Sequence, residues 1–177
     1  KYFAANAIKY ISELEAQGEY KHCIWPEHCL IGTKGNAIED NVAAAVSEWV
    51  RQGKFAIRYV TKGTHPLTEH FGAFAAQVPL ANSPETQINQ DLLSLLSEYH
   101  NVYLAGEAKS HCVATTLKQI LRYAPQLASK LVILEDTMSP VPGFENIADS
   151  IYDEAKSQGV RFSTTAKEKL SNSTVTV

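Results

Sequence analysis

Residues 102–113 read Val-Tyr-Leu-Ala-Gly-Glu-Ala-Lys-Ser-His-Cys-Val, a short apolar run that meets a glycine and is followed by polar residues and a cysteine. The run predicts a strand over 102–105, and the spacing of apolar residues from Cys112 to Tyr123 predicts a helix. A buried strand that passes directly into a helix is typical of a βαβ unit. In parallel sheets the functional site lies at the carboxyl ends of the strands, so the turn after Ala105 is the first place to look for one.

The rest of the chain repeats this alternation of helix and strand. Helical spacing covers residues 2–17, 36–52, 84–98 and 144–158, and short apolar runs that predict strands cover 20–25, 55–60, 131–134 and 160–163. Right-handed crossovers between parallel strands place helices on both faces of the sheet. We therefore predict an α/β protein with a three-layer α/β/α architecture, a mostly parallel sheet and a single domain over residues 1–177.

Composition excludes several classes of function. The 177 residues are 45% hydrophobic and 20% charged, a balance typical of a globular protein, and the net charge is -3. A net negative charge is not typical of a protein that binds nucleic acid through a basic surface. No apolar run reaches the roughly 18 residues of a membrane span. Three cysteines are too few for a disulfide scaffold, so we expect a reducing, cytoplasmic compartment.

Cys112 is the sharpest candidate for chemistry. Its thiol comes at the start of a predicted helix, where the partial positive charge of the helix dipole favours a thiolate. Backbone N–H groups at the same turn can receive an oxyanion, which is the arrangement that nucleophilic acyl transfer needs. The alternative is a cysteine that packs against the sheet, because free cysteines are often buried.

Other turns at predicted strand ends carry weaker signals. Lys62 follows an apolar run and could hold a thiolate, or it could be a solvated lysine at a strand end. Glu69 and His70 could line a pocket rim or form a simple polar turn. His111 adjoins Cys112, but neighbouring residues on a helix point about 100° apart, so a Cys–His dyad is not expected. Asp136 follows the predicted strand 131–134 and so also lies at a predicted strand end.

The turn after the first predicted strand is equally ambiguous. Trp25 could stack on a planar substrate or fill the core. His28 lies beside Cys29, but the spacing is not that of a zinc site, so a structural histidine is favoured. Cys23 and Cys29 are expected to be buried thiols.

Three stretches together resemble a known family. Trp25-Pro-Glu-His-Cys-Leu-Ile-Gly-Thr-Lys-Gly35, Val60-Thr-Lys-Gly63 and Gly106-Glu-Ala-Lys-Ser-His-Cys-Val113 resemble the isochorismatase-like cysteine hydrolases, and most closely their nicotinamidase-related branch. The resemblance covers roughly residues 20–165. It implies the isochorismatase-like α/β fold and a Cys-Asp-Lys triad.

The resemblance also implies a role for individual residues. Cys112 would attack a carboxamide carbon, Lys62 would support the thiolate, and the amides of Ala108 and Cys112 would form the oxyanion hole. The peptide bond between Glu107 and Ala108 would be cis. The implied binding residues are Trp25, Glu107 and His111 for the substrate, and His28 for a divalent metal ion, zinc or iron.

Some of the family's pattern is not in this chain. The catalytic Asp and the other metal ligands belong to a first strand that would precede residue 1, and the usual Asp-Tyr before the nucleophile is Ser110-His111 here. The chain opens with Lys1, and its single methionine is Met138. We expect this N-terminal strand and metal-motif segment in the intact protein, as a partner of the present chain; the alternative is a degenerate relative.

These features predict a cysteine amidohydrolase of NAD metabolism that cleaves a small carboxamide such as nicotinamide through a thioester. Another C–N hydrolase of the superfamily is the first alternative, and an inactive binding or oligomerising module is the second. The predicted partners are a small amide substrate and further copies of the chain in a homo-oligomer.

Overall fold

The computed structural model describes residues 2–53 and 57–168, which form two compact units. The smaller unit comprises Ile11–Thr61, and the larger one contains the described residues up to Tyr10 and from Lys62 onward. The sheet, the hydrophobic core cluster and Cys112 all belong to the larger unit.

The sheet has three parallel strands in the order β1-β2-β3: β1 is Val102–Leu104, β2 is Leu131–Leu134 and β3 is Arg161–Ser163. Leu131, Val132 and Ile133 of the central strand are fully buried. Successive strand residues point to opposite faces, so both faces of β2 are covered, as expected of a parallel strand. The predicted α/β class with a parallel sheet is confirmed.

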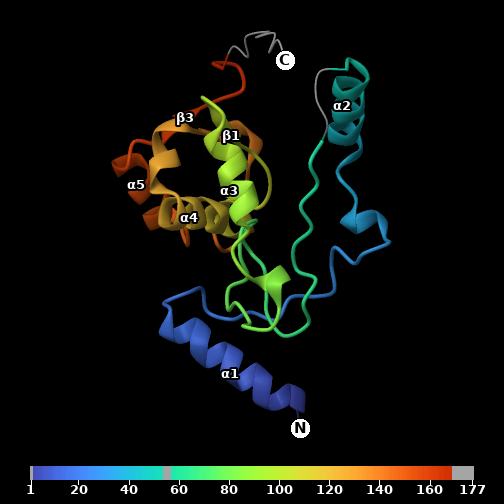
Figure 1. Ribbon diagram of the computed structural model, residues 1–177, viewed down its shortest axis with the longest axis vertical. Helices are drawn as coiled ribbons and strands as arrows, with labels where there is room; N and C mark the ends of the chain where they lie inside the picture. Colours follow the sequence, from blue (N-terminus) through green and yellow to red (C-terminus); the bar gives the residue numbers. More distant parts are fainter. Residues whose placement is uncertain (1, 54–56, 169–177) are drawn as a thin grey trace. The chain divides into compact units, whose positions relative to one another are not determined.

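Three helices pack around this sheet: α3 is Gln90–Ser97, α4 is Ala114–Tyr123 and α5 is Asp149–Ser157 (Figure 1). Each presents apolar residues to one core, because apolar positions recur at helical spacing. The buried core cluster contains Phe74, Leu93, Ala114, Leu117, Ile120, Leu121, Ala124, Leu127, Ala128, Leu131, Ile133, Ala148, Tyr152, Ala155 and Val160. This core fixes the start of α4, where Cys112 lies.

Two further helices lie toward the N-terminus. Helix α1 is Tyr2–Ala16 and ends before Gly18, whose φ of +65° suits glycine. Helix α2 is Asp40–Arg51, and the Glu39 carboxylate caps it by accepting the N–H groups of Asn41 and Val42. Both helices confirm the helical spacing of the sequence, although α2 begins after residue 36. Within the described residues, no helix combines the length and apolar character needed to cross a membrane.

The predicted helix over 84–98 is shorter in the structure because a polar residue inside it caps a new helix. Asn89 accepts the N–H of Leu92 and caps α3, so the predicted helix over 84–98 divides into a 3₁₀ turn, Pro84–Thr86, and α3. Further 3₁₀ turns are Lys34–Asn36, Pro125–Lys130 and Glu135–Thr137.

Two predicted strands are not formed where the structure describes them. Residues 20–25 and 57–60 make no sheet pairing, whereas residues 55–56 of the second prediction lie outside the described residues. Their apolar side chains remain in solvent: Ile24 is 89% exposed and Tyr59 is 71% exposed. An apolar run supplies strand propensity but no partner strand, and the described part of the sheet offers neither segment a neighbour. The apolar side chains of Val42 and Trp49 on α2 are likewise exposed, not buried as their spacing predicts.

Candidate active site

Cys112 lies in the connection between β1 and α4. The chain leaves β1 at Leu104, passes Gly106 with φ +128°, and enters a π-helical turn, Lys109–Val113, that leads into α4. The carbonyl of Ala108 accepts the N–H groups of both His111 and Val113, which closes this turn. The thiol is therefore held at the carboxyl end of a strand and at the start of a helix, where the sequence places it.

Lys62 approaches this thiol from a distant part of the chain. Its Nζ atom lies 3.7 Å from Sγ of Cys112 and donates a hydrogen bond of 2.9 Å to the carbonyl oxygen of His70. Burial, and then the charge of Lys62, lower the pKa of the His70 imidazole. The carbonyl bond holds the ammonium beside the sulfur, where a positive charge attracts a thiolate.

His111 contacts Ser110 and two aromatic rings, those of Phe71 and Phe144. The Ser110 hydroxyl and Nδ1 of His111 share a hydrogen bond of 2.9 Å, and the same hydroxyl accepts the N–H of Val141. The imidazole ring packs edge-on against Phe144, with a centroid separation of 5.1 Å, and is only 9% exposed. This burial lowers the pKa of His111, so the neutral ring is favoured.

Glu107 and Ala108 form a loop that is tied to the segment after β2. The Ser139 N–H and hydroxyl both donate to the Glu107 carboxylate, at 3.0 and 3.1 Å, and the Ser139 carbonyl accepts the N–H of Lys109. The peptide bond between Glu107 and Ala108 is cis, as the resemblance implies. The carboxylate of Glu107 thus holds the loop in place, and its contact with substrate stays a prediction, like the oxyanion role of Ala108.

Sequence reasoning missed Thr116 and Gln119. The Thr116 hydroxyl donates to the carbonyl of Cys112 at 2.7 Å and accepts the N–H of Ala73 at 3.1 Å. Oε1 of Gln119 accepts the N–H of Phe74, and Nε2 donates to the carbonyl of Ala75. The spacing was a signal: the two polar residues follow Cys112 by four and seven positions, which places them on one stripe of the helix.

The predicted residues of the smaller unit lie in an irregular segment. Trp25 is half-buried, and His28 is exposed with its Nδ1 atom 2.6 Å from the carbonyl oxygen of Pro26. Cys23 and Cys29 are exposed, so the prediction that they are buried thiols is wrong. The reason is the missing strand pairing over 20–25, which leaves this segment outside a core.

The predicted metal ion does not fit the side chains that the structure brings together. Among the described residues, no three histidine, cysteine, aspartate or glutamate side chains gather closely enough to hold a metal. His28, the predicted ligand, has Nδ1 2.6 Å from the carbonyl oxygen of Pro26, and its role as a ligand stays a prediction. We therefore derive no step of the chemistry through a metal ion.

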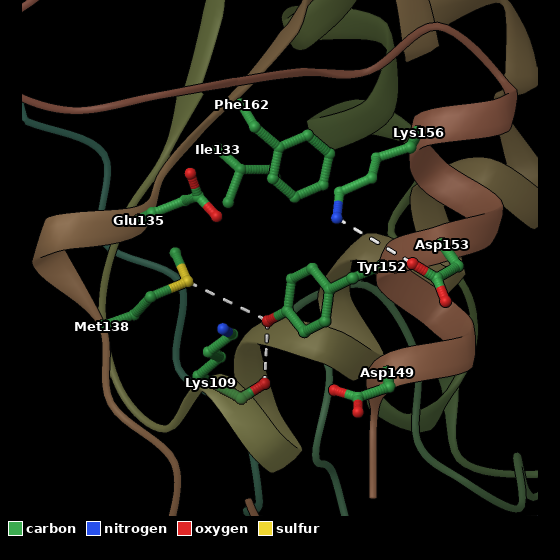
Figure 2. Close-up of a pocket in the computed structure, with 9 residues that line it drawn as sticks. All are labelled: Lys109, Ile133, Glu135, Met138, Asp149, Tyr152, Asp153, Lys156 and Phe162. Carbon is green, nitrogen blue, oxygen red and sulfur yellow. Dashed lines mark hydrogen bonds and ion pairs between the residues drawn. The ribbon is translucent and has the colours of Figure 1, made fainter. Parts of the chain in front are cut away.

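A cavity of about 230 Å³ lies at the carboxyl ends of β2 and β3, beside α5. Figure 2 shows its lining, and the Tyr152 hydroxyl there donates to the carbonyl of Lys109 at 2.8 Å. The lining residues are Lys109, Ile133, Glu135, Met138, Asp149, Tyr152, Asp153, Lys156 and Phe162. Lys156 is paired with Asp153 at 3.9 Å and lies over the ring of Phe162, so charges in the lining partly satisfy one another. Neither Cys112 nor Lys62 lines this cavity.

The Asp136 carboxylate lies near the end of β2 and is held by Thr165. It accepts the N–H of Thr165 at 2.9 Å and the hydroxyl of the same residue at 2.5 Å. These hydrogen bonds lower the pKa of Asp136. The carboxylate thus connects the end of β2 to the segment that follows β3.

Comparison with known proteins identifies the fold. No family model matches the sequence, and no match was found among curated proteins. The yeast nicotinamidase Pnc1p bound to the inhibitor nicotinaldehyde matches with a TM-score of 0.59 at 20% identity, over 81% of this chain and 60% of that chain. A second structure of yeast Pnc1p matches with a TM-score of 0.55 at 23% identity, over 82% of this chain and 62% of that one.

An Acinetobacter baumannii nicotinamidase and pyrazinamidase matches with a TM-score of 0.53 at 19% identity, over 82% of this chain and 61% of that chain. The chain thus spans about three fifths of the length of these solved structures. The likeness confirms the predicted isochorismatase-like α/β fold.

Proposed function

We propose that the protein is a cysteine amidohydrolase that cleaves a small carboxamide such as nicotinamide into the carboxylic acid and ammonia. The observation that carries the proposal is the approach of the Lys62 ammonium to the Cys112 thiol at the start of α4. The shared fold with solved nicotinamidases supports the same class of chemistry. The activity of the whole protein and its substrate are part of this proposal.

In the first half of the proposed reaction, Sγ of Cys112 bonds to the carbonyl carbon of the amide. The thiol loses its proton, and the carbonyl oxygen carries negative charge in the tetrahedral intermediate. Collapse of this intermediate breaks the C–N bond, and the amide nitrogen leaves as ammonia with that proton. In the second half, water adds to the thioester carbon, the C–S bond breaks, and a proton from water restores the thiol.

Each predicted site residue has a role in this scheme. Lys62 stabilises the anionic sulfur before attack, since its ammonium is the partner that the structure places beside Sγ. The backbone amides of Ala108 and Cys112 receive the oxyanion in our proposal. We assign Glu107 and His111 to substrate binding as the resemblance implies, and the substrate contact implied for Trp25, a residue of the smaller unit, stays a prediction.

The test is ammonia release from nicotinamide by the purified protein. Cys112→Ala should abolish release because it removes the atom that bonds to the substrate. Cys23→Ala is the matched control, since it removes an exposed thiol that has no place in the scheme. Ammonia release that persists in Cys112→Ala, or no ammonia release by the unaltered protein, would contradict the proposal.

Nicotinaldehyde provides a second probe of the same site. It is an aldehyde, so a thiolate that adds to it has no amine to expel, and the reaction stops at the adduct. Nicotinaldehyde should therefore protect Cys112 from alkylation by iodoacetamide and leave Cys23 unprotected. Equal alkylation of Cys112 with and without the aldehyde would contradict a nicotinamide-like substrate.

A second candidate is a C–N hydrolase that acts on a different small amide. The buried pair of Ser110 and His111 favours it, because these residues replace the Asp-Tyr that the resembled branch carries before its nucleophile. Ammonia release from a panel of aromatic and aliphatic primary amides separates the two candidates. Faster turnover of an aliphatic amide than of nicotinamide would select the second one.

A further inference from the structure

A series of contacts begins at the side chain of Cys112, the proposed nucleophile, and returns to its backbone, so the contacts form a closed ring. Lys62 touches Sγ of Cys112 with its ammonium and donates the 2.9 Å hydrogen bond to the carbonyl of His70. Three residues later, the N–H of Ala73 donates to the hydroxyl of Thr116 at 3.1 Å. That hydroxyl donates in turn to the carbonyl of Cys112 at 2.7 Å, which returns the ring to its starting residue.

From this ring we propose that Thr116 is a positioning residue, which sets where the Lys62 ammonium lies relative to the Cys112 thiol. The inference rests on the proposed function, because it concerns the same nucleophile. Thr116 does not touch the reacting sulfur itself. It acts through the segment His70–Ala73, whose two ends hold the lysine and the threonine.

A second set of hydrogen bonds connects α4 to the chain just after the segment His70–Ala73, so a change at Thr116 can alter the position of Lys62. Oε1 of Gln119 accepts the N–H of Phe74 at 3.0 Å, and Nε2 donates to the carbonyl of Ala75 at 2.8 Å. Gly72 lies so close to this amide that an added Cβ would be 2.1 Å from Oε1. The His70 carbonyl is therefore tied to the helix that carries Cys112, and Lys62 is tied to that carbonyl.

Thr116 is the member of the ring that touches the backbone of the nucleophile. Replacing its hydroxyl with a methyl group breaks both bonds of this oxygen, to Cys112 and to Ala73, and leaves the Lys62 side chain intact. The segment then loses its bond at Ala73 and keeps its bonds at Phe74 and Ala75, which come from Gln119 and from the N–H of Asn89. In our proposal the His70 end of the segment is then less restrained, and the lysine follows its carbonyl away from the sulfur. The expected consequence is a slower reaction of the thiol without loss of the fold.

The experiment measures the rate at which iodoacetamide alkylates Cys112 at pH 7, by mass spectrometry of the peptides, in the complete protein. We expect Thr116→Val to slow alkylation of Cys112 about fivefold to tenfold, an effect of the size expected from lost hydrogen bonds. Thr116→Ser keeps the hydroxyl and should restore the rate to within about twofold. The rates at the exposed Cys23 and Cys29 serve as internal references within each sample.

Thr86→Val is the matched control for a merely structural effect. The Thr86 hydroxyl also bonds the backbone: it accepts the N–H of Leu80 at 2.9 Å and donates to the carbonyls of Ser83 at 2.7 Å and Leu80 at 3.4 Å. Its loss should lower stability but leave the Cys112 rate unchanged. Should Thr116→Val not yield folded protein, Thr116→Ala loses the same hydroxyl and is judged by the same criteria.

The outcomes separate the positioning role from the proposed function. A Cys112 that reacts quickly in the unaltered protein and equally quickly in Thr116→Val overturns the positioning role and leaves the nucleophile in place. A Cys112 that reacts no faster than Cys23 in the unaltered protein overturns the proposed function itself. Equal slowing by Thr86→Val and Thr116→Val would also overturn the positioning role.

Discussion

Nζ of Lys62 lies 3.7 Å from Sγ of Cys112, although 50 positions separate the two residues in the chain. The contact joins the end of one apolar run to the start of a helix, and the His70 carbonyl holds the lysine there. A positive charge in this position attracts a thiolate, which is the nucleophilic form of cysteine. The account of function depends on this pair.

The charge of Lys62 should matter more for turnover than for folding. Lys62→Met keeps the length of the side chain and removes the ammonium, so we expect kcat/KM for nicotinamide to fall by about 10²–10³. The fall should come from kcat, since the scheme gives Lys62 no contact with bound substrate. Lys130→Met is the matched control, because Lys130 also donates to a backbone carbonyl, that of Ser97 at 2.7 Å. A similar loss in both variants would show a general effect of removing a lysine.

Stability should fall as the pH drops below about 6.5, the ordinary pKa of histidine. Burial lowers the pKa of His111 in the folded protein, and the unfolded chain has the ordinary value. Between these two values the unfolded chain binds more protons, so acid favours unfolding, and the contribution of His111 is complete above pH 6.5. His70, with its lowered pKa, contributes in the same direction.

Urea unfolding at pH 7.5 and pH 5.5 measures this effect. His111→Asn removes the titrating ring but keeps a polar side chain that can accept from or donate to the Ser110 hydroxyl. The difference in the free energy of unfolding between the two pH values should shrink in this variant. An unchanged difference would show that His111 is not the group responsible.

Gly72 should tolerate no side chain. A Cβ at this position would lie 2.1 Å from Oε1 of Gln119, and that amide cannot move without losing its bonds to Phe74 and Ala75. We expect Gly72→Ala to lower the free energy of unfolding by about 1–3 kcal/mol, the usual cost of overpacking. Gly35→Ala is the control, because its Cβ would meet nothing nearer than 3.7 Å. Equal stability of the two variants would contradict the described packing.

Tyr152 should contribute to stability through its hydroxyl group. The side chain is 6% exposed, and the hydroxyl donates to the carbonyl of Lys109 in the turn that carries Cys112. Tyr152→Phe should lower the free energy of unfolding by about 1 kcal/mol, measured in urea. Tyr103→Phe should cost less, because the Tyr103 hydroxyl bonds Glu168 at a half-exposed site where water can replace it. The reverse order of the two losses would contradict this assignment.

Local patterns in the sequence predict the larger unit of the fold well. The apolar runs at 102–105, 131–134 and 160–163 become β1, β2 and β3, since each run finds a neighbour. The segments 20–25 and 57–60 are also predicted to be strands, and they form no strand in the described part of the chain. Strand formation depends on a partner far away in sequence, which a local pattern does not specify.

The site shows the same division between local and distant information. The place of Cys112 at a strand-to-helix turn follows from the sequence alone, and the pairing with Lys62 was suggested by resemblance and by the rule that strand ends carry the site. The bonds of Thr116 to Ala73 and of Gln119 to Phe74 span 43 and 45 positions. A local sequence pattern cannot predict these backbone partners. It gives only the spacing of Thr116 and Gln119 from Cys112.

The competition of three cysteines for one reagent tests the central claim most directly. Iodoacetamide at pH 7 should modify Cys112 at least about tenfold faster than Cys23 and Cys29, because the thiolate is the reactive form. Exposure alone predicts the opposite order, since Cys23 and Cys29 are exposed and Cys112 is partly buried. We expect Lys62→Met to abolish the advantage of Cys112. If Cys112 is the slowest of the three, or if Lys62→Met leaves its rate unchanged, the pair is not an activated nucleophile and the proposed chemistry is wrong.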